Sequence, residues 1–201
     1  MPAPLEFYFD FSSPYGYVAA MRIDQIAAKH GRGVEWKPML LGAVFKVAGS
    51  QPLTEYPLKG EYSKKDFARS AREHNIPFNM PSKFPLPTQA AARGVYWLQQ
   101  NAPDKAVLFI KAVYTAFFVE DKDISAPDLI GDIAAGLGVD RAAFMQGIES
   151  AEIKARLREA TEDAIHKRGV FGSPFTFVDG EGFWGADRLD MIDRWLTRGG
   201  W

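Results

Sequence analysis

Segments with the pattern of β-strands are confined to the two ends of the chain. Residues 5–11, LEFYFDF, alternate and are rich in aromatic side chains, and residues 34–39 alternate in the same way. Between them, helical spacing of apolar residues as far as Gly31 predicts one helix, and Ser13 followed by Pro14 is a typical helix start. A strand, a helix and a second strand require a parallel pair of strands, with the helix on one face of the sheet.

The middle of the chain carries almost no strand signal. Residues 42–62 contain repeated glycine and proline and predict a long irregular loop. After this loop, helical periodicity dominates as far as residue 168. The predicted helices cover residues 63–75, 88–101 and 104–119, and further ones follow the capping residues Ser125, Asp140 and Ser150. For the first of these helices, Ser63 and Asp66 form the pattern of a capping box.

Strand signals return near the C-terminus. Residues 175–178 are rich in β-formers, Asp179-Gly180 predicts a turn, and residues 182–184 predict a short antiparallel strand. A last helix is predicted over residues 188–197, with Asp187 as its N-cap.

The order of these elements favours one interrupted domain over two independent ones. The chain has 201 residues, of which 47% are hydrophobic, and this suits a single globular domain that carries an insertion. We therefore expect an α/β fold in which residues 1–39 and 169–201 form a mixed sheet with its flanking helices. Residues 40–168 are expected to form an all-helical insertion.

The composition excludes several classes of chemistry. The 24 basic and 25 acidic residues give a net charge of −1, which provides no field for holding a nucleic-acid backbone. The chain has no cysteine, so disulfides, thiolate metal sites and cysteine nucleophiles are excluded, and any thiol chemistry needs a thiol from a ligand. The sequence shows neither the pattern of a signal peptide nor a long apolar stretch, so we expect a cytoplasmic protein without membrane contact.

Familiar catalytic motifs are missing. The sequence contains no Walker A motif, no G-x-S-x-G elbow and no H-E-x-x-H pair. His30, His74 and His166 are scattered along the chain, so no metal site is predicted.

The first candidate site is Ser13, where a strand ends and a helix begins. The start of a helix carries partial positive charge, which favours anions. A hydroxyl group at this point can donate a hydrogen bond to a thiolate, although no base is evident that would make the hydroxyl itself a nucleophile. Serine is also an ordinary helix cap, and the spacing alone favours that simpler role.

Two further candidates lie near the C-terminus. A cis peptide bond between Ser173 and Pro174 would turn the backbone N–H and C=O of Ser173 toward a ligand. Asp187, at the end of the segment WGAD, either caps the last helix or holds the amino end of a ligand together with backbone N–H groups of that turn. Without further context, capping is the favoured role.

Three segments of the chain resemble one enzyme family. FYFDFSSPYGYVA, GSQPLTEYPLKGEY and RGVFGSPFTFVDGEGFWGADRLD are similar to the 2-hydroxychromene-2-carboxylate isomerases and to the related kappa-class glutathione transferases. The resemblance covers essentially the whole chain. It implies a thioredoxin-like fold with a helical insertion, glutathione as the cofactor, a small aromatic substrate and a homodimer.

The resemblance also implies which residues bind glutathione. They are Ser13, Ser50, Lys59, Ser173, Pro174, Trp184, Gly185, Ala186 and Asp187. Ser13 falls on the serine that bonds the glutathione sulfur, Lys59 on the lysine near the glycyl carboxylate, and Ser173 on the residue whose backbone pairs with the cysteinyl part. The segment WGAD falls on the part that receives the γ-glutamyl end, and the bond before Pro174 is expected to be cis. Many members of the family have Asn at the position of Ser50 and a more polar residue at the position of Ala186.

Three functions stay open. The resemblance favours a glutathione-dependent isomerase acting on an aromatic substrate of the 2-hydroxychromene-2-carboxylate or benzylidenepyruvate type, by thiolate addition, bond rotation and elimination. A kappa-like glutathione transferase is the second function, and a non-catalytic thioredoxin-like binding module is the third. Arg93 is either the ligand of a substrate carboxylate or a surface residue. The aromatic residues Phe45, Tyr56 and Tyr96 either line a substrate pocket or belong to the core.

Overall fold

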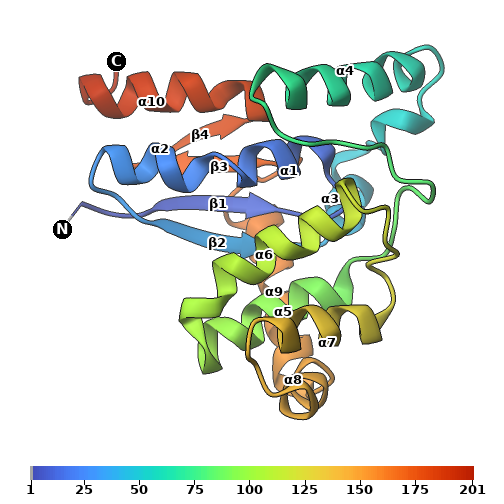
Figure 1. The fold of residues 1–201 in the computed structure, drawn as a ribbon. Coiled ribbons are helices and arrows are strands. Elements are labelled where there is room, and N and C mark those ends of the chain that lie inside the picture. Colours follow the sequence, from blue (N-terminus) through green and yellow to red (C-terminus); the bar gives the residue numbers. More distant parts are fainter. Residues whose placement is uncertain (1) are drawn as a thin grey trace.

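One four-stranded sheet, in the order β2-β1-β3-β4, organises the computed structural model, which describes residues 2–201 (Figure 1). β1 (Leu5–Phe9) pairs in parallel with β2 (Val34–Pro38) and antiparallel with β3 (Phe175–Val178). β4 (Glu181–Trp184) pairs antiparallel with β3. The predicted mixed sheet, built from a β-α-β unit and a β-β-α unit, is confirmed.

Two helices, and not the single predicted one, connect β1 to β2. α1 (Pro14–Ala20) ends shortly before α2 (Ile23–Lys29) begins. The break lies at Arg22, whose φ of −122° is outside the helical range. The Arg22 guanidinium reaches His74 Nε2 at 2.9 Å and Asp190 Oδ1 at 2.6 Å, and these contacts stabilise the break. The apolar spacing continues across it, so the sequence pattern could not reveal it.

Only helices and turns lie between β2 and β3 in the described chain. They are α3 (Leu41–Ala48), the 3₁₀ turn η1 (Leu53–Glu55), α4 (Lys59–Glu73), α5 (Gln89–Asn101), α6 (Pro103–Phe118), α7 (Pro127–Gly136), α8 (Arg141–Ile148) and α9 (Ala151–His166). Asp140 and Ser150 cap α8 and α9 through their side chains, as predicted. None of these helices, nor any other within residues 2–201, is both long and apolar enough to cross a membrane.

The loop predicted over residues 42–62 is wrong in part. The segment LGAVFKVA forms α3, because Leu41 and Val44 are spaced to be buried on one face of a helix. The predicted capping box at Ser63 is also wrong, since α4 begins earlier, at Lys59. The Ser63 hydroxyl donates to the carbonyl oxygen of Lys59 at 2.7 Å inside that helix.

Two other predicted caps are displaced. Ala126, and not Ser125, occupies the N-cap position of α7. Ser125 Oγ donates instead to Asp123. Asp187 lies in the 3₁₀ turn η2 (Ala186–Arg188), and α10 (Leu189–Arg198) follows it with no side-chain cap. The Asp187 carboxylate is therefore not used as a helix cap.

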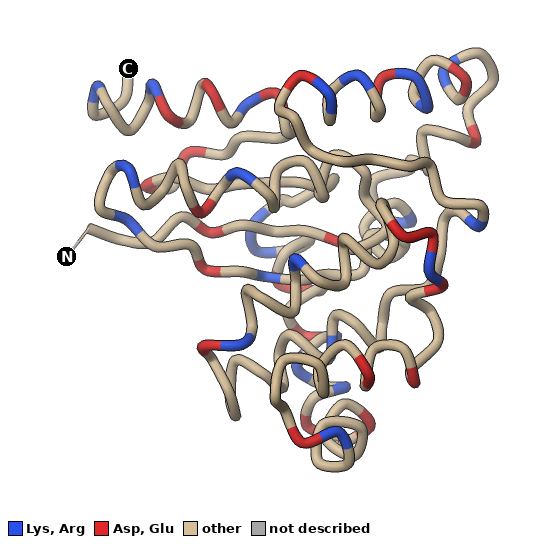
Figure 2. Tube along the Cα trace, viewed as in Figure 1, with Lys and Arg blue, Asp and Glu red and all other residues tan. Residues whose placement is uncertain are grey.

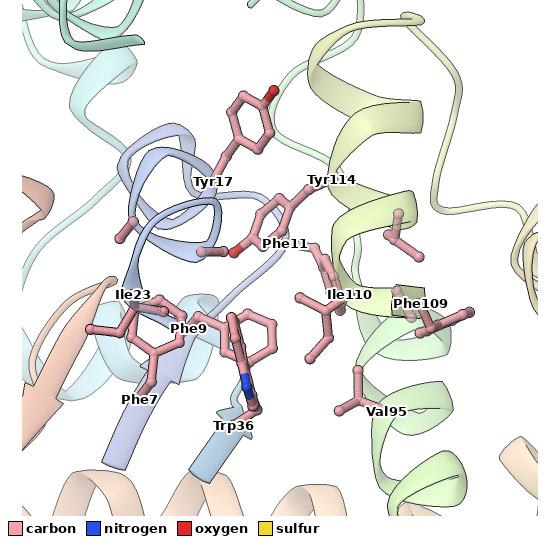
Figure 3. Packing of buried hydrophobic residues seen from close by; sticks show 14 of the residues in the cluster. Phe7, Phe9, Phe11, Tyr17, Ile23, Trp36, Val95, Phe109, Ile110 and Tyr114 are labelled. Carbon is pink, nitrogen blue, oxygen red and sulfur yellow. The ribbon is translucent and has the colours of Figure 1, made fainter. Parts of the chain in front are cut away.

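The main core lies on the face of the sheet that α1, α2, α6 and α10 cover, and it is rich in aromatic rings (Figure 3). Phe9 is fully buried, with its ring centroid 5.5 Å from Phe7, 5.4 Å from Phe11, 5.9 Å from Trp36 and 6.0 Å from Tyr114. Because strand side chains alternate between the two faces, neighbouring strand residues build a second cluster on the other side, beneath α3 and α9. The sheet is therefore covered on both faces.

Candidate functional site

A cavity of about 920 Å³ opens where β1 ends and β3 begins. Its lining comes from the start of α1, from residues 41–59, from α4 and from the segments that flank β3 and β4. This volume falls within the range of small-molecule sites. Both basic and acidic residues occur along α4 and α10, so neither helix presents a single sign of charge (Figure 2).

The cavity brings together all but one of the residues implied to bind glutathione. Its lining includes Ser13, Ser50, Lys59, Ser173, Trp184, Gly185, Ala186 and Asp187. Pro174 is not part of the lining, but its peptide bond to Ser173 is cis, as predicted. A second cis bond, between Phe84 and Pro85, was not predicted.

Ser13 is a buried residue in the lining of this cavity. Its Oγ accepts from the N–H of Gly16 at 2.9 Å, which makes it the cap of α1, and donates to the carbonyl oxygen of Ser173 at 2.9 Å. The Ser173 carbonyl therefore already accepts one hydrogen bond within the protein, and its second lone pair is left for a ligand. The Ser13 hydroxyl can give its proton to a ligand atom only by turning away from this carbonyl. α1 has seven residues, so the partial charge of its N-terminus comes from a short helix.

Asp10, whose carboxylate is buried, contacts both Ser13 and Ser173 through its backbone. Its backbone carbonyl accepts from the N–H of Ser13 at 3.0 Å, and its own N–H donates to Ser173 Oγ at 3.1 Å. Asp10 is only 3% exposed. Asp10 was not among the predicted site residues, although a single acidic residue within the aromatic run FYFDF is an unusual feature of the sequence.

A second unpredicted contact attaches α4 to α1 along the cavity wall. Tyr15 Oη donates to Asp66 Oδ2 at 2.5 Å, and Asp66 also pairs with Arg69. Burial opposes ionisation of Asp66, but the hydrogen bonds from Tyr15 and Arg69 outweigh it and hold the pKa of this carboxyl below its usual value. Burial and the neighbouring Asp66 raise the pKa of Tyr15, so its phenol stays protonated and acts as a donor.

The remaining candidates separate into two groups. Phe45 and Tyr56 line the cavity, whereas Tyr96 is buried in the core and donates to the carbonyl oxygen of Pro38 at 2.8 Å. Arg93 does not line the cavity. It borders a separate hollow of about 250 Å³ beside α9, and its Nη1 lies 3.0 Å from Glu149 Oε1. The prediction that Arg93 holds a substrate carboxylate in the Ser13 site does not fit this placement, because Glu149 already neutralises it.

The described residues offer no obvious metal site. Within residues 2–201, no group of three or more His, Asp or Glu side chains lies close enough together to hold a metal ion. His74 borders the cavity, where its ring contacts Arg22. His30 pairs with Asp193, and both side chains are partly buried.

Comparisons with known sequences agree with the predicted resemblance. Residues 4–197 match the family described as DSBA-like thioredoxin domain. The 2-hydroxychromene-2-carboxylate isomerase of Sphingobium xenophagum is 29% identical over 98% of this chain and 99% of its own. That of Pseudomonas sp. (strain C18) is 30% identical over 94% of this chain and 88% of its own. Glutathione S-transferase kappa 1 of Rattus norvegicus is 27% identical over 97% of this chain and 94% of its own.

Solved structures have the same fold. A 2-hydroxychromene-2-carboxylate isomerase structure has a TM-score of 0.87 at 30% identity and covers 96% of this chain and 94% of its own. The cytosolic disulfide reductase DsbM of Pseudomonas aeruginosa, solved with GSH, has a TM-score of 0.67 at 15% identity and covers 97% of this chain and 96% of its own. This second likeness is one of fold alone. The predicted thioredoxin-like fold is confirmed.

Proposed function

Because the chain belongs to the DSBA-like thioredoxin domain family and, within it, to the 2-hydroxychromene-2-carboxylate isomerases, we propose that it is a glutathione-dependent isomerase. Its substrate would be an aromatic compound of the 2-hydroxychromene-2-carboxylate or benzylidenepyruvate type. The observation that carries the proposal is the single cavity in which the Ser13 hydroxyl, the Lys59 ammonium and the segment WGAD face the same space.

The chemical groups around the cavity fit the parts of glutathione. Lys59 supplies a cation for the glycyl carboxylate, and Asp187 supplies an anion for the γ-glutamyl amine. Gly185 has a φ of +113°, and a side chain at this position would collide with the Asp187 carboxylate. Only glycine therefore lets the turn hold Asp187 in this orientation. The Ser173 backbone lines the same cavity and contacts Ser13.

Glutathione bound in this cavity would supply the chemistry of a thiolate, namely reversible addition to the substrate's double bond, rotation about that bond and elimination. Ser13 would stabilise this thiolate by donating a hydrogen bond from its hydroxyl group, with the proton staying on Oγ. When the Ser13 hydroxyl turns toward the thiolate, its hydrogen bond to the Ser173 carbonyl breaks. This carbonyl can then accept a hydrogen bond from a ligand N–H. Phe45, Tyr56 and Phe171 provide apolar walls on which a flat aromatic substrate can pack.

Titration with glutathione, followed by calorimetry and by an isomerisation assay, tests this proposal. We expect saturable binding, together with conversion of an aromatic enone-pyruvate only when glutathione is present. S-methylglutathione is the control, because it keeps the groups that bind but lacks a free thiol, so it should bind without supporting turnover. Lack of binding up to millimolar glutathione would contradict both an isomerase and a transferase. Accumulation of a stable glutathione adduct would instead favour a kappa-like transferase. This is the second candidate function, because the kappa enzyme of Rattus norvegicus is 27% identical to this chain.

Replacement of Lys59 by methionine tests the end of the site that receives the glycyl carboxylate. Lys59 is exposed, so its ion pair with this carboxylate is expected to contribute about 1 kcal/mol, and Lys59→Met should raise the Kd for glutathione about fivefold. The difference should shrink as salt is added, because exposed charges are screened. Lys65→Met, on the same helix but outside the cavity lining, is the matched control. Equal Kd values for the two variants would show that Lys59 does not contribute to glutathione binding.

A further inference from the structure

The Asp10 carboxylate is held entirely by neutral groups. Its Oδ1 accepts from Ser12 N at 2.8 Å, from Ser12 Oγ at 2.9 Å and from Thr88 Oγ1 at 3.0 Å. Its Oδ2 accepts from the N–H of Leu41 at 2.7 Å. These donors come from three segments, the turn before α1, the start of α3 and the residue before α5, and two of them, Ser12 and Leu41, line the cavity.

No cation compensates the charge of Asp10. None of the ion pairs among residues 2–201 includes this carboxylate. From α6, Tyr114 contributes a phenol that donates to the Asp10 backbone carbonyl at 3.0 Å, and burial keeps the pKa of this phenol well above its usual value, so it is neutral. From the segment before β3, Ser173 contributes a hydroxyl. Burial raises the pKa of the Asp10 carboxyl above its ordinary value, although the surrounding hydrogen bonds oppose this shift.

One hydroxyl group connects this buried carboxylate with the cavity. Ser12 lines the cavity, and its Oγ donates to Asp10 Oδ1. A hydroxyl can accept one proton while it releases another, so it can pass a proton between two groups that do not touch. Ser12 is also the sequence neighbour of Ser13, beside which the proposed thiolate forms.

We infer that Ser12 and Asp10 form a relay that takes up the thiol proton of glutathione bound in the cavity. The inference rests on the proposed function. Ser12 Oγ accepts the thiol proton, directly or through one water, while its own proton passes to Asp10 Oδ1. The S–H bond breaks, its electron pair stays on sulfur, and an O–H bond forms on Asp10, so no further reactant is needed. The negative charge moves from Asp10 to the sulfur, and the site never holds two adjacent anions. The reverse transfer returns the proton when the thiolate leaves the product.

Proton counting on the unmodified protein tests the relay. Glutathione is titrated near neutral pH in two buffers of different ionisation enthalpy, and thiolate is followed by its ultraviolet absorbance. We expect far fewer protons to be released to the buffer than thiolates are formed, because Asp10 retains the thiol protons. S-methylglutathione corrects for proton changes that do not come from the thiol. Release of one proton per thiolate would overturn the relay while leaving the proposed function intact. Absence of binding or of thiolate would overturn both.

Two variants interrupt the relay at different points. Ser12→Ala leaves Asp10 in place but removes its link to the cavity, so we expect proton release to rise to about one per thiolate formed. Ser125→Ala is the matched control, since Ser125 bonds Asp123 through its N–H and its Oγ just as Ser12 bonds Asp10, but outside the cavity lining. Asp10→Asn should behave like Ser12→Ala. If Asp10→Asn does not fold, Ser12→Ala and Ser125→Ala are sufficient to test the relay. The relay would be overturned if Ser12→Ala released the same number of protons per thiolate as the unmodified protein.

Discussion

Ser13→Ala should lower turnover of an aromatic enone-pyruvate by about ten- to a hundredfold and leave the affinity for glutathione nearly unchanged. A free thiol has a pKa of about 8.5, so only a small part of it is thiolate at neutral pH. A hydroxyl donor beside a helix N-terminus is expected to lower the pKa of the bound thiol by about one to two units. Without the hydroxyl, the thiol pKa rises, less thiolate is present at neutral pH, and the pH dependence of the rate moves to higher pH.

The matched control for this variant is Ser150→Ala. Ser150 caps α9 by accepting from the N–H of Ile153 at 3.2 Å, and it lies outside the cavity lining, so both variants lose one helix cap, with a cost of about 1 kcal/mol in stability. Only Ser13→Ala should shift the thiolate titration, measured by ultraviolet absorbance with glutathione bound. Equal titration midpoints for the unmodified protein and Ser13→Ala would mean that Ser13 acts only as a helix cap.

The largest loss of stability is expected for Phe9→Ala. Phe9 is fully buried among four other aromatic rings, so its removal leaves a cavity in the middle of the main core. The free energy of unfolding should fall by about 3 to 5 kcal/mol. For a chain of this size, such a loss lowers the melting temperature by roughly 6 to 20 °C.

Leu108→Ala provides the control for this experiment. Leu108 is 52% exposed on α6, and alanine is a good helix former, so its free energy of unfolding should change by no more than about 0.5 kcal/mol. Both variants are compared with the unmodified protein by denaturant unfolding. Similar losses in Phe9→Ala and Leu108→Ala would contradict the description of a tightly packed aromatic core.

Local sequence patterns predict most of the fold because they follow from local physics. The alternation in LEFYFDF and the side-chain caps at Asp140 and Ser150 each depend on a few neighbouring residues. α3 was missed because the glycines and prolines around it predict a loop, while the burial that stabilises it comes from β-strand and α9 residues distant in sequence. The break at Arg22 was missed for the same reason, since its partners His74, just after α4, and Asp190, on α10, are distant in sequence.

The residues of the site could be predicted only through the resemblance of the sequence to a known family. The placement of Ser13, Lys59 and WGAD around one space follows from that resemblance and not from spacing. The hydrogen bonds of Asp10 to Thr88 and of Tyr15 to Asp66 join residues 78 and 51 positions apart, which no local pattern reports. Arg93 was misplaced because a sequence does not say which face of a helix meets a cavity. The homodimer, the cytoplasmic location and the boundaries of the helical insertion stay predictions.

The position of β1 between β2 and β3 has a consequence for synthesis of the protein. β1 and β2 leave the ribosome early, but β3, which covers the other edge of β1, begins only at Phe175. At translation rates of about 5 to 20 residues per second, β1 waits on the order of ten to thirty seconds with one edge unpaired. Ser173, the partner of Ser13, arrives with β3, so the nascent chain has no complete site. A ribosome that stalls before the last thirty or so residues therefore leaves a chain with an open strand edge, which is prone to aggregation and unable to bind the cofactor proposed for it.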